Sequence, residues 1–120
     1  MKLYTLPVRP SIPAQSFGVV LDGRRYRVSL DWIGRIGRWS IDLVREGGEP
    51  VFLGRILATG ADLLRQFQAQ TDVPVGVLVL VDRSGTSREA TLDTLGRSDG
   101  HSLVFVAEIA PVGGASVAEG

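Results

Sequence analysis

Apolar and polar residues alternate between positions 16 and 44 in the manner of two consecutive β-hairpins. Asp22-Gly23 supplies the two positive-φ positions of a type I′ turn, and residues 34–37 (Gly-Arg-Ile-Gly) supply a second turn. The two turns predict cross-strand pairs of Leu21 with Arg24, Val19 with Tyr26, Phe17 with Val28, Trp32 with Trp39, Leu30 with Ile41, and Val28 with Leu43. The segment therefore predicts three antiparallel strands in one register.

This register assigns each side chain to one of two faces, because successive side chains of a strand point to opposite sides of the sheet. The predicted core face consists of Phe17, Val19, Leu21, Tyr26, Val28, Leu30, Trp32, Trp39, Ile41 and Leu43. The opposite face carries Arg25, Arg27, Ser29, Asp31, Ser40 and Asp42. Opposite charges and hydroxyls in such a row suit water or a polar partner.

Four more segments read as strands. Residues 2–8 alternate moderately and end in prolines, which is typical of an edge strand, and residues 50–57 extend the meander. Residues 76–82 are apolar without alternation, which favours a strand buried on both faces. Residues 102–109 form the last predicted strand, after a long loop or irregular excursion at 86–100.

One short helix is expected between the strands at 50–57 and 76–82. Thr59 and Asp62 have the spacing of a helix N-terminus, and Leu63, Leu64 and Phe67 would share one face. The predicted helix runs from about residue 60 for two to three turns and ends between 71 and 74.

These elements predict an all-β protein, mainly an antiparallel β-meander, folded as a compact barrel or a two-layer sandwich with one short α-helix. The length of 120 residues fits one domain. We expect residues 1–110 to form that single domain and residues 111–120, which are small and glycine-containing, to form a flexible C-terminal tail.

Composition narrows the function classes. The chain has no cysteine, which excludes disulfides and thiolate chemistry, and a single histidine, which excludes a multi-histidine metal site in one chain. No apolar run approaches the roughly 20 residues of a membrane-spanning helix, so we expect no association with a membrane. We expect the protein to be made and to fold in a cytoplasm. A net charge of zero argues against electrostatic binding of nucleic acid.

Each candidate for chemistry has a simpler structural interpretation. His101 has no nucleophile at motif spacing, and Asp31 with Asp42 forms a possible carboxylate pair on a face that otherwise reads as a solvated ladder. Tyr26, Trp32 and Trp39 could stack bases in an OB-like module, but the register assigns all three to the core face. We therefore predict no catalytic, cofactor-binding or metal-binding residue, and no cofactor.

The chain resembles a known family in its ordered segments. FGVVLDGRRYRVSLDW is followed by GRWSIDLV, FLGRILATGADLL, PVGVLVLVD and a late DTLG. This order over residues 14–107 resembles the plug proteins of contractile phage-tail baseplates, typified by the cyanophage baseplate plug. The turn glycines and core positions alone would fit many meandering sheets, whereas their linked order is more specific.

The resemblance implies a structural component of the virion tail baseplate, assembled in the host cytoplasm, rather than an enzyme. It implies contacts with baseplate hub and tail tube proteins that plug the central channel, and self-association of threefold or sixfold order around the tail axis. No specific nucleic acid is expected as a partner. Residues 2–8 and 102–109 are the candidate sheet edges for subunit contacts. The alternative is a small OB-like oligonucleotide- or saccharide-binding module, with an unidentified hydrolase as a minor third.

Overall fold

The structure is a computed structural model that describes residues 2–67, 74 and 76–107. The predicted tail at 111–120 lies outside the described residues. Seven strands and one 3-10 helix follow one another along the chain: β1 (Lys2–Thr5), β2 (Ala14–Leu21), β3 (Arg24–Ile33), β4 (Arg38–Arg45), β5 (Pro50–Ile56), η1 (Arg65–Phe67), β6 (Gly76–Asp82) and β7 (His101–Ala107).

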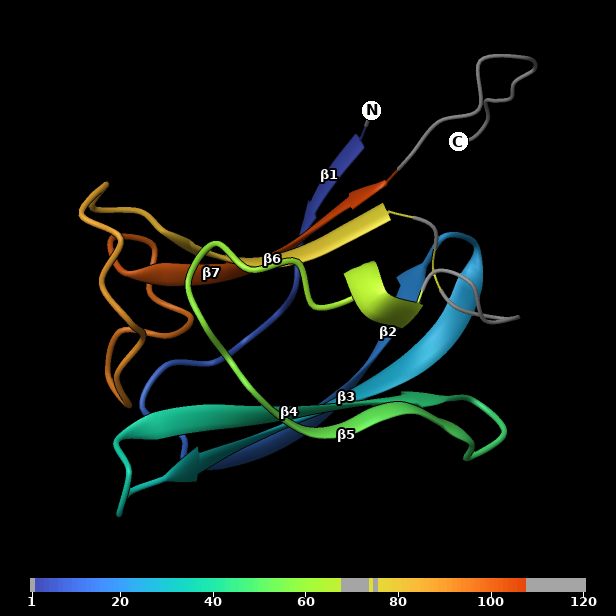
Figure 1. Cartoon of the computed structure of the whole chain (residues 1–120), viewed down its shortest axis with the longest axis horizontal. Helices are drawn as coiled ribbons and strands as arrows, with labels where there is room; N and C mark the ends of the chain where they lie inside the picture. The colour runs from blue at the N-terminus through green and yellow to red at the C-terminus, as the bar shows by residue number, and fades with distance from the viewer. Residues whose placement is uncertain (1, 68–73, 75, 108–120) are drawn as a thin grey trace.

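The described strands form two separate antiparallel sheets (Figure 1). One sheet has three strands in the order β1-β7-β6, and the other has four in the order β2-β3-β4-β5. The four-stranded sheet is the predicted meander. The all-β prediction is confirmed, and of the two architectures considered the chain adopts the two-layer arrangement.

The tandem hairpins have the predicted register. Val19 lies opposite Tyr26 in the first hairpin, and Trp32 lies opposite Trp39 in the second. Asp22 and Gly23 have φ angles of 55° and 77°, so both central residues of the first turn occupy the left-handed region that a type I′ turn requires. The turn therefore determines which side chains reach the core.

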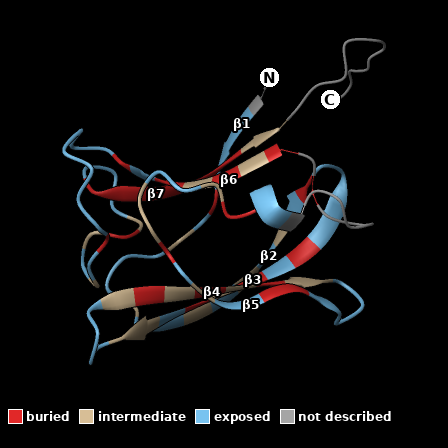
Figure 2. Ribbon diagram, viewed as in Figure 1, coloured by how far each residue is buried: buried red, intermediate tan, exposed pale blue. Residues whose placement is uncertain are grey.

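The core lies between the two sheets (Figure 2). Val28, Leu30, Ile41 and Leu43 have no exposed surface, and Phe17, Val19 and Trp32 are partly buried at the margin. The three-stranded sheet contributes further side chains to the same core: Leu78, Leu80, Leu103 and Phe105. Burial of each such side chain stabilises the fold by roughly 1.5–3 kcal/mol, before the entropy cost of ordering the chain.

The expected α-helix is not formed in its described part. Asp62 makes an isolated antiparallel bridge to Val79, and the next residues form only a turn and the 3-10 helix η1. The Asp62 carboxylate accepts hydrogen bonds from the N–H groups of Leu64 and Leu78, at 3.0 and 3.2 Å. Pairing with β6 thus outcompetes the local helix signal, and residues 68–74 of that prediction fall almost entirely outside the described residues.

Two strand predictions also need correction. The first strand ends at Thr5 rather than Val8, because the N–H of Val8 donates to the carbonyl oxygen of Leu6 in the same segment instead of to β7. β6 is buried on one face only: Leu78 and Leu80 have no exposed surface, whereas Val81 is 37% exposed. The valines at 77, 79 and 81 lie on the outer face of the sheet, which is apolar but only partly buried.

Candidate interaction surfaces

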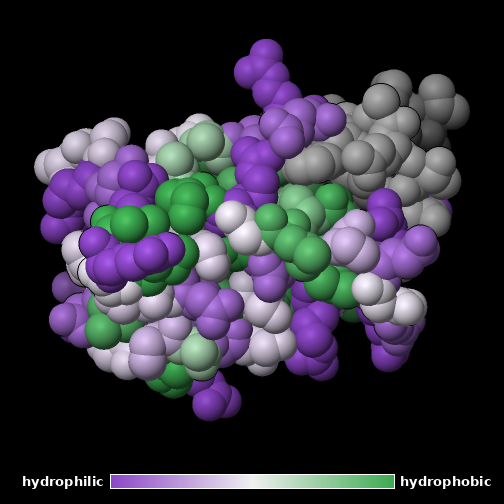
Figure 3. Space-filling view, turned by 60° about the horizontal axis from the view of Figure 1, so that its bottom comes forward, coloured by the Kyte–Doolittle hydropathy of each residue, from purple (hydrophilic) through white to green (hydrophobic). Residues whose placement is uncertain are grey.

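The outer face of the four-stranded sheet carries the polar row that the register predicts. Its members Arg25, Arg27, Ser29, Asp31, Ser40 and Asp42 are all exposed or half-buried. Arg27 donates from Nη1 to Ser16 Oγ at 3.1 Å across the β2–β3 pair. On the face drawn in Figure 3, hydrophilic and apolar side chains are interspersed, and the apolar ones form separate patches. Mixed surfaces of this kind suit protein contacts with polar rims.

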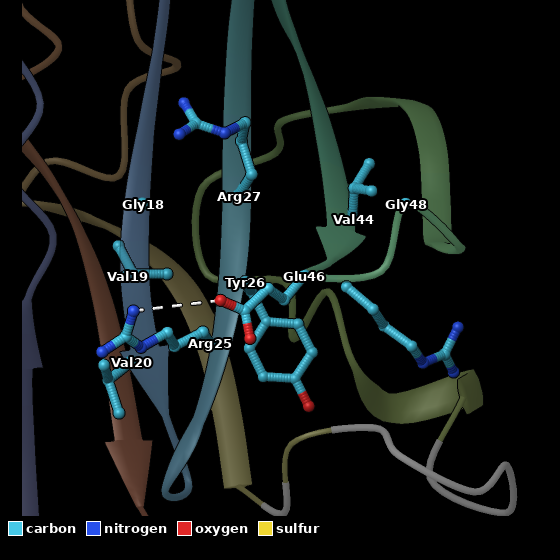
Figure 4. A pocket seen from close by; sticks show the side chains of 10 residues that line it. Gly18, Val19, Val20, Arg25, Tyr26, Arg27, Val44, Glu46 and Gly48 are labelled. Carbon is cyan, nitrogen blue, oxygen red and sulfur yellow. Dashed lines mark ion pairs between the residues drawn. The ribbon is translucent and has the colours of Figure 1, made fainter.

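A shallow groove lies on this face beside the turn between β4 and β5 (Figure 4). It encloses about 550 Å³ and is lined by apolar residues of β2 and by arginines of β3 and β4. Arg25 and Glu46 face each other at 3.8 Å, with 75% and 71% of their side chains exposed. An ion pair so exposed contributes little to stability. Beneath it, burial raises the pKa of the Tyr26 hydroxyl.

The densest polar cluster surrounds Asp82 at the end of β6. Its carboxylate accepts hydrogen bonds from the N–H and hydroxyl of Ser84, the hydroxyl of Thr86, and both the N–H and the guanidinium of Arg88. The Arg88 hydrogen bond, followed by those of Ser84, holds the pKa of this carboxyl far below its usual range, despite the opposing effect of desolvation. These hydrogen bonds hold the first residues of the long excursion between β6 and β7 against the end of β6.

His101 fixes the other end of that excursion. Its ring is fully buried, with Nε2 at 2.8 Å from the carbonyl oxygen of Arg88 and Nδ1 at 2.9 Å from Thr94 Oγ1. A carbonyl oxygen only accepts, so Nε2 carries the proton and Nδ1 is available to accept from the Thr94 hydroxyl. These contacts agree with the predicted structural role of His101. Both partners, Arg88 and Thr94, lie in the excursion.

The residues considered for chemistry lie in two separate places: Asp31 and Asp42 are diagonal neighbours on the outer face of the β3–β4 pair, as expected, and His101 is remote from both. Asp42 lies opposite Ser29 and accepts the N–H of Gly54 at 2.6 Å, so its carboxylate supports the irregular part of β5. Asp31 is exposed on β3, and His101 belongs to the other sheet. Among the described residues, no group of three or more histidine, aspartate or glutamate side chains is placed to hold a metal ion.

The aromatic residues considered for base stacking lie in or against the core. Tyr26 and Trp39 are 3% and 1% exposed, and Trp32 packs edge-on against Trp39 with ring centroids 5.5 Å apart. The Trp39 Nε1 donates to the carbonyl oxygen of Thr91 at 3.0 Å. Tyr26 and Trp39 are therefore not accessible to stacked bases, and Trp32 is half-buried.

The outer face of the three-stranded sheet is apolar, as the sequence of residues 76–82 predicts, but it is only partly buried. Val77, Val79 and Val81 of β6 alternate with core leucines and so point away from the core. Their neighbours on this face include Val104 and Val106 of β7 and, on β1, Leu3, which is 63% exposed. The face is apolar in character and is a candidate contact surface.

The predicted edge role of residues 102–109 is wrong in the described part, because β7 lies between β1 and β6. The first strand is an edge, as predicted. A second exposed edge, β2, was not considered. Its sequence from Ala14 to Leu21 contains no charged residue, which was a visible signal, but its edge position follows only from the strand order.

Two antiparallel sheets that pack face to face, with many of their polar side chains hydrogen-bonded within the fold, define a β-sandwich. The family model described as "Cyanophage baseplate Pam3 plug gp18" matches residues 3–108. The chain therefore belongs to this family of phage baseplate plug proteins and is a structural component of a phage tail baseplate. No curated protein matches the chain.

The described residues include no helix of the length and apolar character needed to cross a membrane.

Proposed function

We propose that this protein closes the central channel of a contractile-tail baseplate by docking on hub and tail tube proteins, and that it works without catalysis. The observation that carries the proposal is the family match over residues 3–108, which spans both sheets and all seven strands apart from the first residue of β1. A plug needs a stable fold and several contact surfaces, and it has to be released when the tail contracts.

The polar groups of the fold support this proposal. Asp82 and His101 use their side chains to fix the excursion between β6 and β7, and Asp42 supports β5. Each of these groups thus has a structural task. The outer faces remain for contacts, one of them polar and the other mainly apolar, and they suit different partners.

Assembly in the host cytoplasm and self-association of threefold or sixfold order belong to the same proposal. Homo-oligomers with closed symmetry are the usual solution for proteins that occupy an axis. A channel on the tail axis requires either one central copy or a ring, and the exposed sheet edges of this fold offer a means of ring formation.

The experiment is to purify intact tail particles from the producing strain, locate the chain by cryo-EM and count copies by mass spectrometry. Density for the two hairpins at the distal end of the tail axis is the expected result. The opposing result is absence from purified tails together with salt-sensitive retention on a single-stranded DNA column, since phosphate contacts give a steep dependence on salt. Retention on a glycan column instead would favour the saccharide-binding alternative.

A further inference from the structure

The two sheets have four edge strands, β1, β6, β2 and β5, which differ in how far their backbone groups are available to a neighbour. The edge of β6 is covered. The N–H groups of Gly60 and Leu63 donate to the carbonyl oxygens of Leu80 and Leu78, at 2.9 and 2.8 Å. The N–H of Leu78 donates in turn to Asp62 Oδ1. The segment before η1 therefore takes up the hydrogen-bonding groups that β6 would otherwise offer to a neighbour.

The edge at β5 is irregular. Its pairing with β4 shifts register on either side of Leu43, and Gly54 has a φ of 67°, outside the range of a regular strand. The guanidinium of Arg55 lies over the Phe52 ring, 5.9 Å from its centroid, on the same strand. A bulged strand that carries a charge is a poor template for another strand.

The edge at β1 is regular. The N–H of Leu6 donates to the carbonyl oxygen of Leu103, at the end of the β1–β7 pair. Hydrogen-bonded and non-hydrogen-bonded positions alternate along an antiparallel pair, so the backbone groups of Tyr4 also face β7, and those of Leu3 and Thr5 face the edge. Within the described part of the chain, no further strand lies beyond this edge.

The edge at β2 is regular and longer. The Trp32 N–H donates to the carbonyl oxygen of Pro13 at 2.7 Å, so by the same alternation every second residue of β2 from Gln15 to Leu21 faces β3. The residues whose backbone groups face the edge are Ala14, Ser16, Gly18 and Val20. Val20 is 61% exposed and lies near Arg25 in Figure 4.

An uncharged edge of eight residues is unusual, because soluble proteins normally protect such edges with charges, prolines or bulges. The edges of β1 and β2 cannot pair with each other within one copy. They belong to different layers, and packed sheets lie about 10 Å apart, whereas paired strands lie about 4.8 Å apart. In two copies the same edges can pair.

We propose that β1 of one copy pairs with β2 of a second copy of this chain, so that the sheet β6-β7-β1 continues into the sheet β2-β3-β4-β5 of its neighbour. The residues facing the two edges, Leu3 and Thr5 on β1 and Ala14, Ser16, Gly18 and Val20 on β2, are all uncharged, so pairing buries no unpaired charge. This inference rests on the proposed function, for which it supplies the self-association.

Three lysine variants test the pairing with closely matched sites. Leu3→Lys places a charge on the β1 edge and Val20→Lys places one on the β2 edge. Leu53→Lys is the control on β5, and the three parent side chains are 63%, 61% and 62% exposed. Analytical ultracentrifugation of the full chain over a range of concentrations gives the association constant, and thermal unfolding checks that each variant is folded.

The expected result is self-association of the parent chain, weakened roughly tenfold or more by Leu3→Lys and by Val20→Lys, and unchanged by Leu53→Lys. An equimolar mixture of the Leu3→Lys and Val20→Lys chains should associate more strongly than either chain alone, because one pair of unmodified edges is restored. Such complementation separates pairing of β1 with β2 from pairing of like edges.

A parent chain that stays monomeric at every concentration overturns the pairing, and so does equal weakening by Leu53→Lys. Absence of complementation in the mixture also overturns it. The proposed function is tested separately by the tail particles: a monomeric chain that is still located at the distal tail axis rejects the edge pairing and leaves the plug proposal standing.

Discussion

The indole Nε1 of Trp39 donates a hydrogen bond to the backbone carbonyl oxygen of Thr91 at 3.0 Å, and this bond joins the core of the four-stranded sheet to the excursion before β7. Trp39 is 1% exposed. The residue therefore has two tasks, which are to fill the space between the sheets and to satisfy a backbone group of a segment that has no regular structure of its own.

Trp39→Ala should lower the free energy of unfolding by about 3–5 kcal/mol, because it removes the largest buried side chain and leaves a cavity. Urea unfolding followed by circular dichroism measures the loss. Trp39→Phe is the control: it retains most of the apolar volume and loses the hydrogen bond, with an expected cost of about 1–3 kcal/mol. An alanine variant as stable as the parent would contradict the assigned core face.

The contribution of Asp82 to stability should be present at neutral pH and lost in acid. The pKa of the folded-state carboxyl is lowered, so its contribution is fully present above the unfolded value of about 3.9 and is lost as the pH falls from there towards the folded pKa. Asp82→Asn should therefore melt at a lower temperature than the parent at pH 7, and the gap should narrow below about pH 4. Melting curves from pH 7 to pH 2 measure this gap.

Asp99 provides the control for that experiment. Its ion pair with Arg97 is exposed, with 75% of the Asp99 side chain accessible, so Asp99→Asn should change the melting temperature much less at pH 7. Equal effects at the two positions would show that the Asp82 cluster does not organise the excursion.

Thr94→Val should loosen the same excursion from its other end. The Thr94 hydroxyl accepts the N–H of Thr91 at 2.8 Å and lies 2.9 Å from Nδ1 of the buried His101. Valine leaves both partners without this group, at an expected cost of about 1–3 kcal/mol. Hydrogen exchange should become faster at residues 88–96, and Thr94→Ser, which keeps the hydroxyl, should restore slow exchange. Unchanged exchange in the valine variant would refute the role of this contact.

Gly100→Ala should destabilise the protein because of space rather than backbone conformation. A Cβ at this position would overlap with the carbonyl oxygen of Thr94, which is a backbone atom with little freedom to move. Overpacking of this kind costs about 1–3 kcal/mol. Gly47→Ala is the matched control, since its Cβ would meet no atom within 4 Å, and thermal unfolding of the two variants should separate them. Equal melting temperatures would contradict the close approach.

The hairpin register was accessible to sequence reasoning because its determinants are local. Asp22 and Gly23 specify the turn, the turn specifies the pairing, and the pairing assigns Trp39 and Ile41 to the core. The helix expected near Asp62 shows the opposite case. Its local signal is real, but the same carboxylate accepts the Leu78 N–H, from a strand 16 residues further along the chain.

Of the two polar clusters, only the one at Asp82 has a sign in the sequence. Ser84, two residues after Asp82 at the end of an apolar strand, is a detectable sign of a turn stabilised by the aspartate side chain. The contact of His101 with the Arg88 carbonyl spans 13 residues with no periodic pattern, and nothing in the sequence points to it.

The sequence by itself determined the all-β class, the tandem hairpins, the division of their side chains between core and surface, and the family, because turn residues and period-two alternation act over a few positions. Only the tertiary structure decided that β7 lies inside its sheet, that the edge of β6 is covered and that the edges of β1 and β2 are exposed. Strand order depends on which distant segments pack together, and that is decided by the free energy of the whole core rather than by any local pattern.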